Sequence, residues 1–188
     1  MYVGRTNGGS LRRALFQFDV AGSLPPGATV VSATLKIRVT KTRAEKHTLV
    51  LHRVLVGWGE GSSTPSTSGG GGGGPAADGD ATWLHTFFHT ETWSSACGDF
   101  DHEASAETSV AGNPSWRWTS EQMAADIQQW LDDPASNYGW ILVGNESANQ
   151  TTKRFATREN SDEGHRPLLT VEYTGRRGPS GASRSYLR

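Results

Sequence analysis

Apolar and polar residues alternate along much of the chain with a period of two, which is typical of strands with one buried face. Over 33–40, Ala, Leu, Ile and Val alternate with Thr, Lys and Arg. Seven further segments have the pattern or composition of strands: 14–20, 47–56, 82–89, 105–110, 139–143, 153–157 and 168–173. Trp116 and Trp118 flank Arg117, so both indoles face one side of whatever strand they form. About eight strands predict an all-β fold, a jelly-roll β-sandwich of two antiparallel sheets.

One segment, 120–131, has helical periodicity instead. Its large apolar residues are spaced to share one helix face: Met123, Ile127, Trp130 and Leu131. Thr119 and Gln122 have the spacing of a capping box, and Pro134 ends the pattern. We expect a short amphipathic helix that covers an open end or edge of the sandwich and buries Ile127, Trp130 and Leu131.

Composition limits the class of protein. The 188 residues suffice for one domain, and 23 Gly with 8 Pro indicate many turns. A net charge of −1 gives no reason to expect a nucleic-acid or anionic-membrane partner for the whole chain. The single cysteine, Cys97, excludes an intrachain disulfide, and its ordinary role is that of a small, partly buried residue. No apolar run approaches the roughly 20 residues of a membrane helix, so no membrane insertion is expected.

Two segments differ from the rest in composition. Segment 62–79 includes six consecutive glycines, and we expect a flexible surface loop within one domain that spans 1–174. The tail, 175–188, holds four arginines and no acid. Its composition favours disorder, but Tyr186 and Leu187 could anchor it. We hypothesise that an ordered tail would be ordered by another chain, which makes self-association through the tail a predicted interaction.

The segment with the strongest functional pattern is rich in Trp, His and Thr. Trp83 and Trp93 flank His85 and His89, and exposed indoles are flat platforms that stack on sugar rings. The alternative is that both tryptophans are core or loop-anchoring residues. The two histidines have the spacing of metal ligands on a helix, but on a strand four residues span about 13 Å, which is too far for one ion.

Two pairs of loop acids suggest a hard-cation site. Asp78 and Asp80 form one pair, and Asp99 and Asp101 form the other; both lie in loops that contain glycine. Carboxylate and main-chain oxygens can converge there on calcium, although no complete EF-hand pattern follows. The alternative is that these are solvated loop carboxylates.

Motifs of several enzyme classes are missing from the sequence. The glycine run is not followed by the Lys-Ser/Thr of a P-loop, and neither a Gly-x-Ser-x-Gly elbow nor a His-Glu-x-x-His helix occurs. Among 19 acids, no pair is singled out as catalytic.

Several short motifs resemble DNRLRE-type domains, the family named for disaggregatase-related repeats. The opening of that family is matched at 15–19 (LFQFD), 24–28 (LPPGA) and 32–35 (SATL). Later matches keep the family's order: 57–61 (GWGEG), 79–83 (GDATW), 130–131 (WL), 137–140 (NYGW), 155–160 (FATREN) and 166–171 (RPLLTV). The resemblance covers nearly the whole chain up to Thr174.

That resemblance implies a jelly roll from an extracellular or cell-surface protein. Such domains accompany polysaccharide-active enzymes and large surface proteins, and some relatives are alginate-binding modules. Arg158 and Glu159 match the family's arginine–glutamate motif. We interpret them as an inward-turned salt bridge that pins the late strands, with sugar contact by Arg158 as the alternative.

Together these observations predict a non-catalytic module that binds an acidic polysaccharide or cell-surface glycan, with calcium as a structural cofactor. The predicted binding residues are Trp83, His85, His89, Trp93 and Arg158. A structural module that assembles with copies of itself is the main alternative. A further alternative is a polysaccharide-cleaving or metal-dependent enzyme that uses the histidines or the loop acids.

Overall fold

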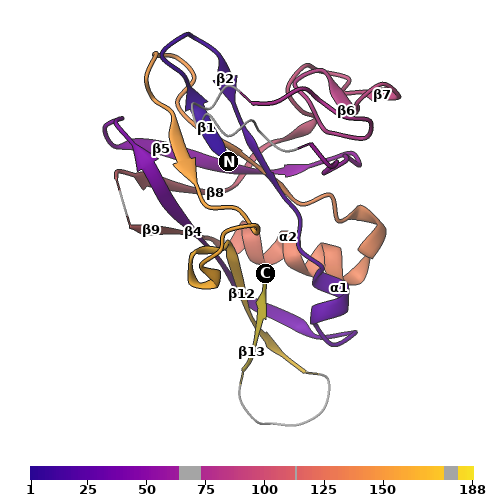
Figure 1. Ribbon diagram of the computed structural model, residues 1–188. Coiled ribbons are helices and arrows are strands. Elements are labelled where there is room, and N and C mark those ends of the chain that lie inside the picture. The colour runs from indigo at the N-terminus through magenta and orange to yellow at the C-terminus, as the bar shows by residue number, and fades with distance from the viewer. Residues whose placement is uncertain (64–72, 113, 176–181) are drawn as a thin grey trace.

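The fold is built around one long strand, β4 (Thr29–Thr42), as the ribbon in Figure 1 shows. The computed structural model describes residues 1–63, 73–112, 114–175 and 182–188. The alternation over 33–40 is confirmed, because the four apolar positions are fully buried and the polar positions between them are half-buried. Side chains at successive strand positions point to opposite faces, so this one strand defines both the core side and the outer side of its sheet.

Two antiparallel sheets make up the sandwich. The seven-stranded sheet contains β4 and six other strands: β1 (Tyr2–Arg5), β2 (Leu11–Arg12), β9 (Ser115–Thr119), β11 (Lys153–Phe155), β12 (Leu168–Thr174) and β13 (Ser183–Leu187). The four-stranded sheet has the order β3 (Ala14–Phe16), β10 (Trp140–Val143), β5 (His47–Val54) and β8 (Phe100–Val110). Every predicted strand overlaps an observed one, and the all-β sandwich is confirmed.

The core lies between the two sheets and is rich in tryptophan. Trp118, Trp130 and Trp140 are each fully buried, and the rings of Trp130 and Trp140 are in contact, with centroids 4.6 Å apart. Trp118 comes from β9 and Trp116 packs partly buried against the same core, so the two indoles do face one side. Three buried indoles supply much of the apolar area that stabilises the domain.

The predicted helix is present as α2 (Glu121–Asp132), with Met123, Ile127, Trp130 and Leu131 buried. It packs on β4 and β8, so it contacts both sheets and covers that side of the sandwich, as expected. The predicted capping box is wrong. Ser120 is the N-cap, and its hydroxyl accepts a bond from the Met123 N–H at 2.9 Å. The Thr119 hydroxyl is already committed, because it donates to the carbonyl of Ala33 at 2.8 Å.

A buried carboxylate joins the helix to the smaller sheet. Asp126 on α2 is 1% exposed and accepts hydrogen bonds from the Trp140 indole at 2.8 Å and from the Ser105 hydroxyl at 2.6 Å. Gln122, one turn earlier, donates to the other carboxylate oxygen at 3.1 Å. A buried charge is tolerated when its oxygens are hydrogen-bonded, so this network fixes the position of α2 against β8 and β10.

The hypothesis for the C-terminal tail is wrong for residues 182–188, whereas residues 176–181 of the tail lie outside the described residues. Residues 183–187 form β13, which pairs antiparallel with β12 of the same chain from Leu169↔Leu187 to Tyr173↔Ser183. Leu187 is 4% exposed and belongs to the main core, and Arg184 pairs with Glu172 across the two strands. The tail is ordered by its own domain because β12 offers it a free backbone edge and the core offers Leu187 a place to bury.

Other elements are short. Beyond the sandwich, a small two-stranded sheet is formed by β6 (His85–Phe87) and β7 (Glu91–Thr92), so the strand predicted over 82–89 is limited to its middle. One helical turn is α1 (Val20–Ser23), and two 3-10 turns are η1 (Pro134–Ser136) and η2 (Glu163–His165). The centre of the predicted glycine-rich loop, 64–72, lies outside the described residues.

Candidate functional site

The two predicted tryptophan platforms have different environments. Trp83 is 38% exposed, and the guanidinium of Arg13 lies over its ring at 5.4 Å. Trp93 is only 6% exposed, packs with Val54 and Ile141 in a second, smaller core, and donates its indole N–H to the Thr82 carbonyl at 2.9 Å. The expectation that Trp93 is an exposed platform is therefore wrong, because its ring serves to attach the β6–β7 segment to the sandwich. Trp83 remains available to a ligand.

The predicted histidines lie near each other but have separate partners. His85 Nδ1 is 3.1 Å from the Thr82 hydroxyl, and His89 Nδ1 is 2.6 Å from the carboxylate of Asp78. The ring of Phe88 contacts both imidazoles, with centroid distances of 5.1 Å to His85 and 3.9 Å to His89. Within the described part of the chain, no three His, Cys, Asp or Glu side chains converge as metal ligands would.

Asp80, a predicted calcium ligand, is instead a loop anchor. It is 5% exposed, and its carboxylate accepts hydrogen bonds from the main-chain N–H groups of Ser62 at 3.0 Å and Ala77 at 2.7 Å. Hydrogen bonds from the Ser63 side chain and from Ala77 lower the pKa of Asp80 below its usual 3.8. Gly61 has φ +68°, and a Cβ there would lie 1.5 Å from an Asp80 oxygen, so only glycine fits. Asp80 thus ties together the two ends of the glycine-rich segment.

The other three predicted calcium ligands also have protein partners. Asp78 is exposed and pairs with His89. Asp99 accepts hydrogen bonds from the Ser94 N–H and hydroxyl, each at 2.7 Å. Burial raises the pKa of Asp99, but these hydrogen bonds outweigh burial and hold the pKa below its usual value. Asp101 accepts from the Glu103 N–H and pairs with Arg53 at 3.1 Å, which together lower its pKa. The four carboxylates are therefore distributed over separate local networks, and calcium binding stays a prediction.

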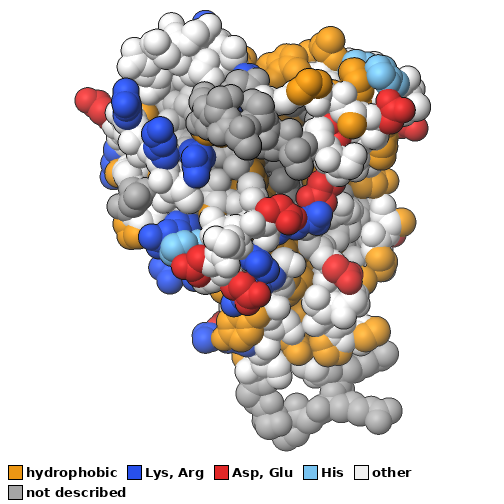
Figure 2. All heavy atoms as spheres, viewed as in Figure 1, with side chains coloured by type: hydrophobic (Ala, Val, Ile, Leu, Met, Phe, Trp, Pro, Cys, Tyr) orange, Lys and Arg blue, Asp and Glu red, His pale blue; other side chains and the backbone are white. Residues whose placement is uncertain are grey.

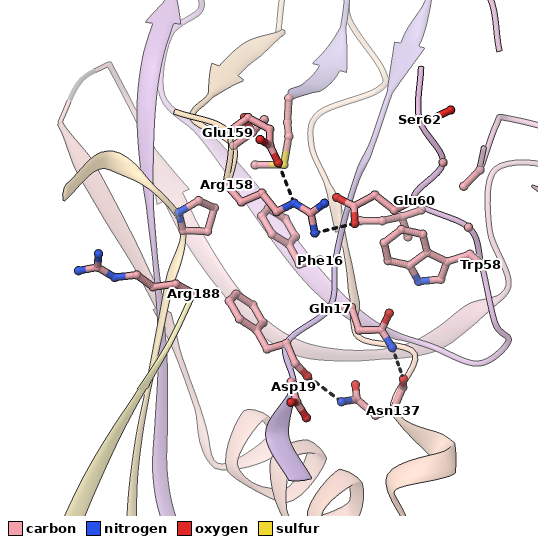
Figure 3. A pocket seen from close by; sticks show the side chains of 18 of the residues that line it. Phe16, Gln17, Asp19, Trp58, Glu60, Ser62, Asn137, Arg158, Glu159 and Arg188 are labelled. Carbon is pink, nitrogen blue, oxygen red and sulfur yellow. Dashed lines mark hydrogen bonds and ion pairs between the residues drawn. The ribbon is translucent and has the colours of Figure 1, made fainter. Parts of the chain in front are cut away.

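Arg158, the fifth predicted binding residue, lies in a groove beside β3. Its guanidinium bonds to Glu159 at 2.9 Å, as the sequence motif suggested, and to Glu60 at 2.8 Å, as Figure 3 shows. The two carboxylates raise the pKa of Arg158. The expected inward orientation is wrong, because the Arg158 side chain is 65% exposed and lines the groove. Figure 2 shows acidic and basic side chains next to each other near the middle of that view.

The groove has a volume of about 1050 Å³ and a mixed lining. Phe16 and Phe18 contribute apolar surface and are each 6% exposed. Trp58 is half-buried, and its indole donates to the Tyr138 carbonyl at 2.8 Å, which fixes the ring. Gln17 also lines the groove and lies on the side of Asn137 in Figure 3. Ligand pockets combine apolar walls with a few fixed polar groups in this way.

The outer face of the seven-stranded sheet carries a second feature, a set of cations. Five residues occupy outward-facing strand positions and are called here the basic face: Lys36, Arg38, Lys41, Arg117 and Arg154. The strand register places Lys36 directly opposite Arg117, and Lys41 directly opposite Arg154. Figure 2 shows Lys and Arg side chains gathered over the side where Figure 1 places β4.

Negative charge near the basic face is scarce. Among described strand positions that point outward from this sheet, Glu172 is the one carboxylate, and it is occupied by Arg184 and the Ser32 hydroxyl. Within the described residues none of the five cations forms an ion pair, and Arg154 donates to the Thr40 hydroxyl at 3.1 Å. Like charges directly opposite each other destabilise a sheet, so this face is costly for the free protein.

Comparison of the chain with protein-family models, with curated proteins and with solved structures found no match. The resemblance to DNRLRE-type domains therefore stays a prediction. In the described residues, no helix has the length and apolar character needed to cross a membrane.

Sequence reasoning missed most of the groove and the whole basic face as sites. Trp58 and Glu60 stand within the glycine-spaced motif 57–61, which was a usable signal for an aromatic and an acid presented by a tight loop. Gln17 gave no such signal. Lys36 and Arg117 could be recognised as outward-facing from alternation, but only the pairing of β4 with β9 brings them together.

Proposed function

We propose that this domain is a non-catalytic module that binds an acidic polysaccharide through the basic face, as part of an extracellular or cell-surface protein. The observation that carries the proposal is the direct opposition of Lys36 to Arg117 and of Lys41 to Arg154 on neighbouring strands. An arrangement that costs stability in the free protein becomes favourable when an anionic chain lies between the cations.

The chemistry of the face suits carboxylate or sulfate groups on an extended polymer. Three of the five cations are arginines, whose planar guanidinium groups bind such anions through two parallel hydrogen bonds. Outward threonines, including Thr34, Thr119 and Thr170 in one cross-strand row, add hydroxyl oxygens that can accept hydrogen bonds beside the cations. An extended sheet face of this kind can contact several successive sugar units.

A polysaccharide is a better fit than a nucleic acid. The net charge of the chain is −1, so it lacks the overall basic charge that is typical of nucleic-acid-binding domains. Duplex DNA carries one charge per about 1.7 Å, and proteins that bind it neutralise many phosphates over a large area. Five cations on one sheet face match the lower charge density of a uronic-acid polymer.

The two alternatives have less support. The self-assembly hypothesis relied on a tail free to reach another chain, whereas β13 pairs with β12 of its own domain. The enzymatic hypothesis relied on histidines and loop acids, and in the described residues each of these has a separate local partner.

The test is electrophoresis through native gels that contain alginate or polygalacturonate. Lys36→Gln and Arg117→Gln should each weaken retention about 1.5- to 5-fold, more strongly at low salt. Arg158→Gln is the matched control, because it removes the same charge from the groove and not from the face. Trp83→Ala tests whether the exposed indole adds a stacking contact to the same ligand.

Three outcomes would contradict the proposal. The first is no retention of the native protein on any acidic polysaccharide. The second is a loss of retention in Arg158→Gln with none in Lys36→Gln or Arg117→Gln, which would move the acidic ligand to the groove. The third is tighter binding to single- or double-stranded DNA than to the polysaccharides, with sensitivity to the same basic-face variants.

A further inference from the structure

We infer that the groove beside β3 is a second binding site, separate from the basic face, and that its ligand is an uncharged, hydroxyl-rich molecule: a neutral oligosaccharide. Its lining comes from parts of the chain that are far apart in sequence, including Gln17, Trp58, Glu60 and Arg158. None of these residues belongs to the basic face, so the inference does not depend on the acidic-polysaccharide proposal.

The charges in the groove disfavour an acidic sugar. The lining side chains include two arginines, and both are already paired: Arg158 with Glu60 and Glu159, and Arg188 with Glu163 at 3.5 Å. A uronate carboxylate would have to compete with these protein carboxylates for the guanidinium groups. Asp19, Glu60 and Glu159 give the lining three side-chain carboxylates against two guanidinium groups, so the lining side chains have no excess of positive charge. A second anion there would gain no net attraction.

Several polar atoms left free in the groove are acceptors, beside the remaining N–H groups of the two arginines. Arg158 bonds to Oε2 of Glu60 and to Oε1 of Glu159, which leaves the other oxygen of each exposed carboxylate available. The Gln17 side-chain nitrogen donates to the Asn137 carbonyl at 2.6 Å, so the amide is held with its oxygen free, as Figure 3 shows. Acceptors of this kind bind hydroxyl groups, which neutral sugars carry on almost every carbon.

The apolar part of the lining matches the other property of a sugar ring. Pyranose rings present C–H groups on one face, and those groups pack against aromatic side chains. Trp58 lies next to Glu60 in Figure 3, and its ring is fixed by the bond from its indole to the Tyr138 carbonyl. Phe16 and Phe18 also belong to the lining, where each adds a small area of aromatic surface. Fixed aromatic surface beside fixed acceptors lowers the entropy that is lost when a ligand is ordered.

The test uses native gels that contain one polysaccharide each: the neutral polymers hydroxyethylcellulose, glucomannan and galactan, the acidic polymer alginate, and the cationic polymer glycol chitosan. The native protein should be retained by at least one neutral gel. Gln17→Ala should weaken that retention about two- to tenfold without loss of folding, because its side chain is exposed and loses one hydrogen bond. Trp58→Ala should weaken it about three- to tenfold, with the melting temperature measured alongside. Lys36→Gln is the control that should leave neutral retention unchanged.

The two proposals fail separately in this design. No retention on any neutral gel, or retention that is insensitive to Gln17→Ala and Trp58→Ala, overturns the groove inference while alginate binding by the basic face can stand. If glycol chitosan retains the protein more strongly than any neutral polymer, and Gln17→Ala weakens that retention, the groove binds a cationic sugar. This result also overturns the groove inference. Neutral retention that depends on the groove, without alginate binding, overturns the acidic-polysaccharide proposal alone.

Discussion

Removal of one cation from the basic face should make the free protein more stable. Lys36 and Arg117 are direct cross-strand partners, whose Cβ atoms are about 4.5–5.5 Å apart in antiparallel sheets. Two unit charges about 5 Å apart in water repel by about 0.8 kcal/mol. Because both side chains are long and can turn apart, we expect Lys36→Gln to raise the free energy of unfolding by about 0.2–0.8 kcal/mol. In a domain of this size that raises the melting temperature by about 0.5–3 °C.

A double-mutant cycle isolates the repulsion between the two residues. Lys36→Gln and Arg117→Gln are made singly and together, and the free energy of unfolding is measured by urea denaturation at about 0.02 M and about 0.5 M salt. Once either cation is gone, the second substitution should bring little further gain, and the coupling should shrink at high salt because exposed charges are screened. Arg38→Gln is the internal control for the loss of one cation by itself, because Arg38 lies opposite Ser115 and has no like charge directly opposite it on β9.

The reasoning is refuted if the cycle at low salt gives no coupling, or coupling that stabilises the native protein. Either result would mean that the two side chains turn away from each other or share an anion that binds in the buffer. The basic face would then impose no cost on the free protein, and the main support for an anionic ligand would be lost.

Three further predictions concern stability. Asp80→Asn should lower the free energy of unfolding by about 1–3 kcal/mol through weakened bonds to Ser62 and Ala77. Because the pKa of Asp80 is lowered in the native protein, this difference from wild type should have its full size above pH 3.8 and should fade as the pH falls below that value. A difference in urea denaturation that does not depend on pH would contradict this. Leu187→Ala should cost about 2–5 kcal/mol because the side chain is buried in the core, and an unchanged denaturation midpoint would show that β13 is not docked in solution. Trp130→Ala should cost about 3–5 kcal/mol as a full truncation of a buried ring, whereas a loss below about 1 kcal/mol would place that face of α2 outside the core.

Features that depend on short stretches of chain could be predicted from the sequence alone. The alternation in β4 and the spacing of Met123, Ile127 and Trp130 each specify which side of an element is apolar, and burial follows from that. Both elements lie where the pattern placed them. The predicted cap of α2 is one residue too early because serine and threonine both cap helices, and the bond to Ala33 engages Thr119 elsewhere.

Features that depend on contacts between distant segments were decided by the tertiary structure. The groove joins Arg158 to Glu60 across nearly a hundred residues, and Trp93 is buried because Val54 and Ile141 happen to lie beneath it. The composition of 175–188 favours disorder because composition says nothing of the free edge of β12, with which β13 pairs. The basic face needed both kinds of information. Alternation turned Lys36 and Arg117 outward, but the register of β4 and β9, which no local pattern specifies, set the two charges opposite each other.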